Sequence, residues 1–289
     1  MAVEEYWAPT ALPAALEHLS AGEVTILAGG TDLMPQSHAG RVTLKRGLLN
    51  LRRVPELHGI ERDGAVVRVG ALCTIGELMV DPLVRAHFGL LAEACDHFAS
   101  DQLRNAATIG GNVCNASPAG DTLPPLLVLD AEAELASKPN GSVETRRVPL
   151  AEFFVGPGRT VRAPGELLTA LWLPVPPAGF VGRFFKFGTR PALDIAAIAI
   201  AIGGVRAGRT LTAARVAYGA VAPVPMRARA TERALEGTPL DAAAIARIAG
   251  VARDEVRPID DVRAPAAYRR LLTAALLREA LAEAWGEGD

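Results

Sequence analysis

Two segments that place adjacent glycines beside a hydroxyl residue, far apart in the chain, constrain the fold most strongly. They are Ala28-Gly29-Gly30-Thr31-Asp32-Leu33 and Thr108-Ile109-Gly110-Gly111-Asn112, the second running on to Ala116-Ser117-Pro118-Ala119-Gly120-Asp121. Glycine lets backbone N–H groups approach an anion without a Cβ in the way, and the hydroxyl adds a donor. A single pair of glycines is more typical of an ordinary tight turn. Together the two segments predict a phosphate site that could clamp a diphosphate.

The common nucleotide-binding motifs are missing. No Gly-Lys-Ser/Thr follows either glycine segment, which excludes a P-loop. No Gly-x-Gly-x-x-Gly joins a first strand to a helix, which excludes the common dinucleotide fingerprint. The predicted phosphate site therefore belongs to another fold.

Composition excludes several classes of partner. Half of the 289 residues are hydrophobic, and the 30 basic and 32 acidic residues leave a net charge of −2 without a long run of one sign. This balance gives no electrostatic reason to bind nucleic acid or a membrane surface. Residues 1–20 lack the pattern of a secretory leader, and the longest apolar run, 195–204, is too short to span a bilayer. We expect a cytoplasmic protein with no nucleic-acid partner and no membrane insertion.

No catalytic or metal-binding constellation is visible. Cys73, Cys95 and Cys114 have no Cys-x-x-Cys spacing, so we interpret them as free thiols, and the five histidines are equally scattered. No Gly-x-Ser-x-Gly or His-Glu-x-x-His motif occurs. We therefore predict no metal site and name no catalytic residue, which fits a protein whose cofactor performs the chemistry.

Hydrophobic periodicity divides the chain into two lobes and a further domain. A first lobe, at about 1–55, combines a helix through Leu12 and Leu19 with strands at 23–27 and 48–51. A second lobe, at about 56–175, begins with a hairpin of strands 59–62 and 65–70 and continues with a capping box at Thr74 and Glu77. It adds a helix at 82–98, a helical turn at 126–129, and strands at 131–136, 145–150 and 167–173.

The prolines at 174, 176 and 177 and Gly179 make a stiff break, where we place the domain boundary. Beyond it, 180–286 shows three strands, at 183–187, 195–205 and 211–221, although 194–202 could equally begin as a helix. Three helices are predicted at 228–235, 242–256 and 266–285. A three-stranded sheet with helices on one face would form a smaller α+β domain.

The glycine segments resemble those of the FAD-binding subunit of the molybdenum hydroxylases, the family of xanthine dehydrogenase and aerobic carbon monoxide dehydrogenase. The resemblance extends through Phe98, the 167–174 strand, Phe185-Lys186-Phe187-Gly188-Thr189-Arg190, Asp194-Ile195-Ala196 and the 218–223 segment, and so covers nearly the whole chain. It implies an α+β fold: a two-lobed FAD-binding domain of the PCMH type over 1–175, and a C-terminal domain of the carbon monoxide dehydrogenase flavoprotein type over 180–286.

The resemblance also implies the residues that bind FAD. They are Leu27, Ala28, Gly29, Gly30, Thr31, Asp32, Leu33, Phe98, Thr108, Ile109, Gly110, Gly111, Asn112, Ser117, Asp121, Leu168 and Lys186. Backbone amides of both glycine segments suit the diphosphate, Leu168 would form an apolar wall, and Lys186 would donate near the flavin. Three of these residues have a simpler interpretation: Asp121 as a helix N-cap, Lys186 as a solvated strand residue and Phe98 as core.

By the same resemblance, the chain passes electrons from the [2Fe–2S] clusters of a small subunit through FAD to an external acceptor. A large molybdopterin subunit completes the complex, a hetero-oligomer that we expect to be a dimer of heterotrimers. The alternative is a self-contained FAD-dependent reductase of related fold, similar to the UDP-N-acetylenolpyruvoylglucosamine reductases. A binding protein that has lost its flavin would show damaged glycine segments, and here both are intact.

Overall fold

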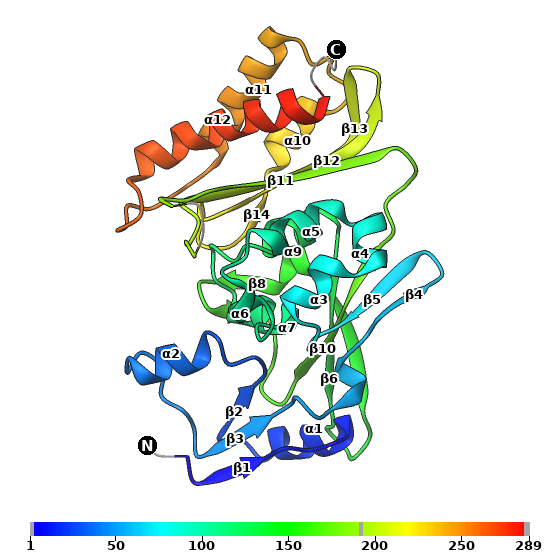
Figure 1. Ribbon diagram of the computed structural model, residues 1–289, viewed down its shortest axis with the longest axis vertical. Helices are drawn as coiled ribbons and strands as arrows, with labels where there is room; N and C mark the ends of the chain where they lie inside the picture. Colours follow the sequence, from blue (N-terminus) through cyan, green and yellow to red (C-terminus); the bar gives the residue numbers. More distant parts are fainter. Residues whose placement is uncertain (1–2, 191–192, 286–289) are drawn as a thin grey trace.

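The computed structural model describes residues 3–190 and 193–285. An N-terminal lobe, a central lobe and a C-terminal domain follow one another along the long axis of the molecule (Figure 1). Helices and sheets are mixed throughout, which confirms the predicted α+β class. The first two lobes and residues 193–195 of the C-terminal domain line one large cavity.

The N-terminal lobe is built on a three-stranded parallel sheet with the strand order β1-β3-β2. Its elements are β1 (Glu5–Trp7), α1 (Leu12–Ser20), β2 (Val24–Leu27), α2 (Leu33–His38) and β3 (Gly47–Asn50). The predicted helix and both predicted strands are confirmed, and α1 buries Leu16 in the same cluster as Leu49. Strand β1 was not predicted, because three residues are too few for a hydrophobic period to show.

The central lobe contains a five-stranded antiparallel sheet in the order β4-β5-β10-β6-β7. The strands are β4 (Ile60–Asp63), β5 (Val66–Gly70), β6 (Glu132–Ser137), β7 (Glu144–Pro149) and β10 (Leu167–Pro174), with a small pair, β8 (Phe154–Gly156) and β9 (Arg159–Thr160), beside them. All five predicted strands of this lobe are confirmed. Val67, Val69 and Leu171 lie on the sheet face that packs against the helices of the lobe.

Short helices lie before and between the strands of the central lobe, most of them between β5 and β6. They are η1 (Pro55–Leu57), α3 (Ile75–Val80), α4 (Pro82–His87), α5 (Gly89–Asp96), α6 (Asp101–Arg104), α7 (Ile109–Asn115), α8 (Leu123–Val128) and α9 (Leu150–Phe153). The capping box is confirmed, since Thr74 Oγ1 accepts a bond from Glu77 N and the Glu77 carboxylate accepts one from Thr74 N. The single helix predicted at 82–98 is wrong. The chain leaves helical geometry at Phe88, whose fully buried ring joins the core, and Gly89 starts a second helix.

The C-terminal domain is a sheet in the order β11-β12-β13-β14, covered on one face by three helices (Figure 1). Its elements are β11 (Phe180–Phe187), β12 (Ile198–Ala207), β13 (Thr210–Gly219), β14 (Met226–Arg227), α10 (Arg229–Leu235), α11 (Ala242–Glu255) and α12 (Ala266–Trp285). The three predicted strands and three predicted helices are confirmed. A two-residue edge strand, β14, was missed, and no helix precedes β12 in the described part of 194–202.

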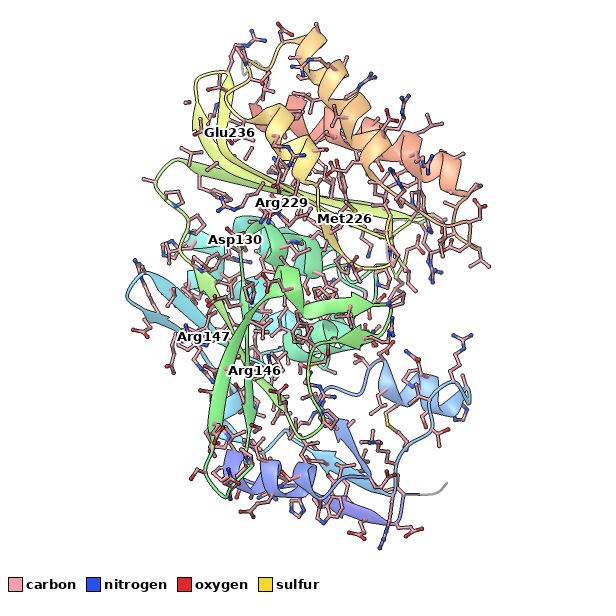
Figure 2. The ribbon with its side chains drawn as sticks, turned by 180° about the vertical axis from the view of Figure 1, so that it is seen from behind. Asp130, Arg146, Arg147, Met226, Arg229 and Glu236 are labelled. Atoms are coloured by element: carbon pink, nitrogen blue, oxygen red, sulfur yellow. The ribbon has the colours of Figure 1, made fainter. Side chains whose placement is uncertain are left out.

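The other face of this sheet packs on the central lobe through α5 and α8, and an ion-pair network closes the junction. Figure 2 shows Asp130 there, opposite Met226 and Arg229. Arg227, with only 6% of its side chain exposed, donates to Asp130 Oδ1 at 2.6 Å and to the Leu127 carbonyl at 3.1 Å. Arg215 also pairs with Asp130. The contact fixes the sheet that carries Lys186 against the central lobe.

Candidate cofactor site

A cavity of about 1070 Å³ is lined by residues of the N-terminal lobe, the central lobe and the start of the C-terminal domain. Both glycine segments line it, and in Figure 1 the turn between β2 and α2 lies opposite α6 and α7. A Cβ on Gly29 would collide with the carbonyl oxygen of Ala106, which shows how closely the two lobes approach. The volume is slightly above the range of about 300–1,000 Å³ that is usual for small-molecule sites, so the cavity is large enough for a sizeable ligand.

The first glycine segment presents unused backbone donors. Among the described residues, the N–H groups of Gly29, Gly30, Thr31 and Asp32 have no hydrogen-bond partner in the protein, although all four residues line the cavity. Gly30 has a φ of +75°, a left-handed conformation that glycine adopts without strain. Successive N–H groups around such a turn form a concave anion-binding surface. This segment has the geometry predicted for a diphosphate site.

The second glycine segment uses its N–H groups within the protein. Ile109 N donates to Cys73 O, Gly110 N to Ala71 O, and Gly111 N to the hydroxyl of Thr108, which caps α7. A Cβ on Gly110 would lie 2.7 Å from both Cβ and O of Ala71. Gly110 is therefore required for packing against the β5–α3 connection. This differs from our expectation that its missing side chain serves the approach of a phosphate.

The second segment still offers polar groups to the cavity. The Thr108 oxygen accepts a bond from Gly111 N, so its O–H is available as a donor. Asn112 accepts the Thr122 hydroxyl proton at 2.7 Å through Oδ1, which leaves its NH₂ group for a ligand. Both residues line the cavity. Two side chains thus take the place of the expected backbone amides.

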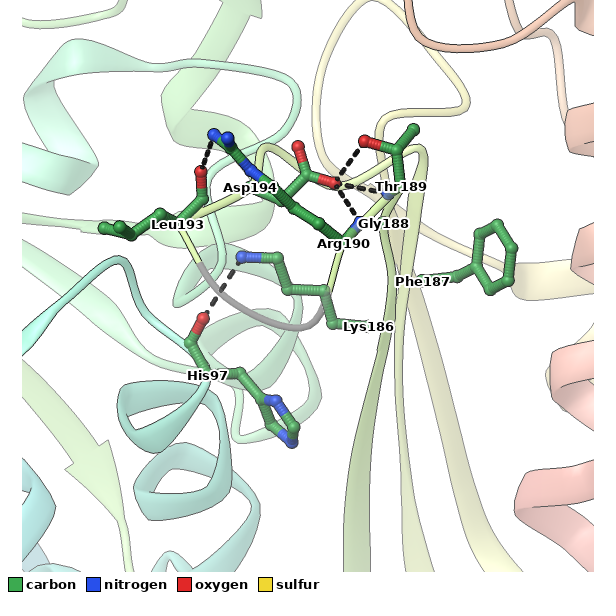
Figure 3. Close-up of a pocket in the computed structure, with 8 residues that line it drawn as sticks. All are labelled: His97, Lys186, Phe187, Gly188, Thr189, Arg190, Leu193 and Asp194. Carbon is green, nitrogen blue, oxygen red and sulfur yellow. Dashed lines mark hydrogen bonds between the residues drawn. The ribbon is translucent and has the colours of Figure 1, made fainter.

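Asp121 and Lys186 form a buried ion pair between the central lobe and β11. Lys186 Nζ lies 2.7 Å from Asp121 Oδ2, and the side chains of Lys186 and Asp121 are 8% and 10% exposed. Lys186 Nζ also lies 3.2 Å from the His97 carbonyl oxygen, as Figure 3 shows. Thr122, not Asp121, is the N-cap of α8, so the capping interpretation of Asp121 is wrong, as is the solvated-strand interpretation of Lys186. Burial raises the pKa of Asp121 to about 6, although Lys186 and His97 act against the increase.

The second carboxylate oxygen of Asp121 is unsatisfied. Oδ1 is buried and has no hydrogen-bond partner, and the residue lines the large cavity. A buried carboxylate oxygen without a donor is costly, and the cavity is the direction from which a ligand hydroxyl could supply one. The ribityl and ribose chains of FAD carry such hydroxyl groups. The free amides, the cavity volume and this oxygen together fit the cofactor.

The other predicted site residues divide into two groups. Ala28, Leu33, Phe98, Ser117 and Leu168 line the cavity beside the glycine segments. Phe98 also packs against the core of the central lobe, so its two interpretations are compatible. Leu27 does not line the cavity, and Ile109 is fully buried in the core. Ile109 anchors the second segment in the core of the central lobe, and Leu27 ends β2 directly before the first segment.

Sequence reasoning missed a smaller cavity of about 390 Å³ that adjoins the large one at Leu193 and Asp194. His97, Lys186, Phe187, Gly188, Thr189 and Arg190 complete its described lining (Figure 3). The Asp194 carboxylate accepts bonds from the backbone N–H groups of Thr189, Arg190 and Ile195. The run 185–190 and Asp194 were part of the resemblance, but nothing in their spacing indicated that they enclose a space.

No group of three or more His, Cys, Asp and Glu side chains among the described residues could hold a metal ion, and none of the helices described is long and apolar enough to cross a membrane. Cys114 lines the large cavity, and burial raises the pKa of its thiol to about 11. This thiol is therefore protonated at neutral pH.

Comparison with known proteins identifies the family. The family described as FAD binding domain in molybdopterin dehydrogenase matches residues 2–176, and the CO dehydrogenase flavoprotein C-terminal domain matches residues 183–284. The chain belongs to the family of FAD-binding medium subunits of the molybdenum hydroxylases, and its cofactor is FAD. The family resemblance inferred from the sequence is confirmed. The comparisons favour this family over a self-contained reductase.

Individual relatives cover almost the full chain. The xanthine dehydrogenase FAD-binding subunit of Escherichia coli O157:H7 is 32% identical over 272 residues, which cover 92% of this chain and 91% of the relative. The carbon monoxide dehydrogenase medium chain of Hydrogenophaga pseudoflava is 31% identical over 284 residues, covering 97% and 96%. A solved carbon monoxide dehydrogenase structure from that organism matches with a TM-score of 0.92 and 31% identity, covering 98% of each chain. These relatives are subunits of oxidoreductase complexes.

Proposed function

We propose that this chain is the electron-transferring subunit of a three-component molybdenum hydroxylase. It receives electrons from a small subunit that carries [2Fe–2S] clusters and passes them through FAD to an external acceptor. A large molybdopterin subunit oxidises the substrate, and the complex is a dimer of heterotrimers. The naming of similar proteins as medium chains of carbon monoxide dehydrogenase supports the assembly.

One observation carries the proposal. The cavity joins four unpartnered backbone N–H groups at 29–32 to an unpartnered carboxylate oxygen on Asp121, and no acid–base or nucleophile set was found in the sequence. When bound, FAD supplies the electron chemistry, and the protein binds and orients it. We propose the seventeen residues named in the sequence analysis as the cofactor-binding set, with Leu27, Ile109 and Gly110 acting through the turn conformation and packing.

The residues of this set have separate tasks in the proposal. The amides at 29–32 bind the diphosphate, and Thr108 and Asn112 add donors from the opposite wall. Leu168 forms an apolar wall for the flavin, and Asp121 accepts bonds from hydroxyl groups of the cofactor. Lys186 orients Asp121 and, because it comes from β11, makes the site depend on the C-terminal domain. We further propose the domain limits 1–175 and 180–286, supported by the prolines between β10 and β11.

Co-purification tests the proposal. The chain is expressed with the products of neighbouring genes, and the absorbance of the bound FAD is followed after addition of candidate hydroxylation substrates. We expect bleaching only when the iron–sulfur and molybdopterin subunits are present. Robust turnover of an organic substrate by the isolated 289-residue chain would contradict the proposal, and so would failure of the chain to associate with either partner.

A further inference from the structure

Arg162 places a positive charge in the wall of the FAD cavity. This residue is not among those that the family resemblance implies for FAD binding. It lies in the loop between β9 and β10, is half-buried and lines the cavity. Its Nη1 donates to the Glu166 carbonyl oxygen at 2.6 Å. Among the described residues, its Nε and Nη2 atoms have no hydrogen-bond partner in the protein. Two guanidinium nitrogens therefore remain for a ligand.

The loop that carries Arg162 is held by a nearly buried carboxylate. Glu166, which is 8% exposed, accepts bonds from Arg146 Nε at 2.6 Å, Arg146 Nη2 at 2.8 Å and Ala163 N at 2.7 Å. The two bonds from Arg146 form a bidentate pair and hold the pKa of Glu166 below its usual value. Arg146 Nη2 also donates to the Val161 carbonyl. The loop is fixed on both sides of Arg162, so the guanidinium is positioned before a ligand arrives.

The charge balance of the cavity favours a role for this guanidinium. The charged residues lining it are Asp32, Asp121 and Asp194 against Lys45 and Arg162. Lys45 is exposed on the N-terminal lobe, whereas Arg162 is half-buried on the opposite wall. The charge of Arg162 also acts on the thiol of Cys114, which lies on α7 one turn beyond Gly111. A full positive charge would strengthen the binding of a diphosphate between the lobes, because the amides at 29–32 supply only partial charges.

We propose that Arg162 is a cofactor-binding residue of this chain, whose guanidinium contacts the FAD diphosphate from the central lobe. The amides at 29–32 bind the same diphosphate from the N-terminal lobe, so the two contacts clamp it across the cavity. The inference rests on the assignment of FAD as the cofactor. A planar guanidinium with two free nitrogens suits bidentate recognition of phosphate oxygens.

The test measures FAD affinity of the cofactor-free full chain by flavin fluorescence titration. Arg162→Gln removes the charge and keeps a side-chain donor for the Glu166 carbonyl. Arg162→Lys keeps the charge but lacks the planar guanidinium that can donate two parallel hydrogen bonds. Arg159→Gln is the matched control, because Arg159 lies on the neighbouring strand β9, is exposed and does not line the cavity. Riboflavin, which has no phosphate, is titrated in parallel. Circular dichroism and thermal unfolding establish that each variant is folded.

We expect Arg162→Gln to weaken FAD binding roughly 10-fold or more, the range for losing a charged hydrogen bond, and to leave riboflavin binding unchanged. Arg162→Lys should recover part of the loss, with a stronger dependence on salt, and Arg159→Gln should match the wild type. Equal FAD affinity of Arg162→Gln and wild type would overturn the inference, as would an equal loss for riboflavin. If the wild type itself fails to bind FAD, the cofactor assignment fails instead.

Discussion

In the first glycine segment the N–H groups of Gly29, Gly30 and Thr31 have no partner among the described residues, whereas in the second those of Ile109, Gly110 and Gly111 all donate within the protein. The two segments look alike in sequence, and each has a glycine that permits close packing, Gly29 against Ala106 and Gly110 against Ala71. Of the glycines in the two segments, Gly30 alone has a positive φ. Adjacent glycines therefore indicate a phosphate contact only where their backbone N–H groups also have no partner within the protein.

The largest expected effect is on the second segment. Gly110→Ala should lower the free energy of unfolding of the FAD-free chain by about 2–3 kcal/mol, because its Cβ would overlap Cβ and O of Ala71. Denaturant unfolding of cofactor-free protein measures this. Unchanged stability together with lost FAD affinity would show instead that position 110 lacks a side chain so that the phosphate can approach. The two segments would then not differ in how they use their N–H groups.

Asp121→Asn should weaken FAD binding by roughly 10-fold or more, since hydrogen bonds to a charged acceptor contribute about 1.5–3 kcal/mol. The reason is the buried, unpartnered Oδ1 of Asp121, a residue that lines the cavity. Fluorescence titration at pH 7.5 measures the change, with Asp63→Asn as a control, because Asp63 is exposed at the end of β4 and does not line the cavity. Wild-type affinity in Asp121→Asn would assign this carboxylate to the Lys186 pair alone.

Stability of the FAD-free chain should depend on pH through Asp121. Its pKa is raised from 3.8 to about 6 by burial, so the folded state binds the proton more tightly than the unfolded state. The contribution of this group is therefore fully present below about pH 4 and is lost as pH rises through 6. Subtracting the unfolding free energy of Asp121→Asn from that of the wild type at each pH separates the contribution of Asp121 from those of His97 and Asp194. If this free-energy difference increased with pH, the attraction of Lys186 for the charged carboxylate would outweigh the cost of burying that charge.

The smallest expected effect compares the two threonines. Thr108→Ala removes the side-chain cap of α7 and should cost about 1 kcal/mol of stability in the FAD-free chain. Thr31→Ala removes a side chain with no hydrogen bond among the described residues and should cost less than about 0.5 kcal/mol. Thermal unfolding of the matched pair tests this. Equal losses would show that the threonine of the first segment is structural too.

Local signals predicted most of the fold. The hairpin predicted from strands 59–62 and 65–70 is β4–β5, with Asp63 and Gly64 at its turn, and Thr74 with Glu77 identified the start of α3. The failures depend on contacts between distant residues. The burial of Phe88 divides a periodic helix, and β1 and β14 exist only because a longer strand lies beside them.

The site follows the same division. The residues that line the cavity were recognisable by resemblance, but the partners of their N–H groups were not. Gly110 and Ala71 are far apart in sequence, and Arg162 has no motif of its own. Which amide is free and which is bonded depends on tertiary structure, so only the folded chain distinguishes the two glycine segments.

The central claim is that the first segment binds a diphosphate with its free amides. Calorimetric titration of the cofactor-free chain with FAD and with FMN tests it most directly, because FMN carries the flavin and one phosphate but no diphosphate. We predict that each chain binds one FAD, which acid precipitation releases completely, and that FMN binds at least about 100-fold more weakly than FAD. Equal affinity for FMN, or flavin left on the acid-precipitated protein, would contradict it.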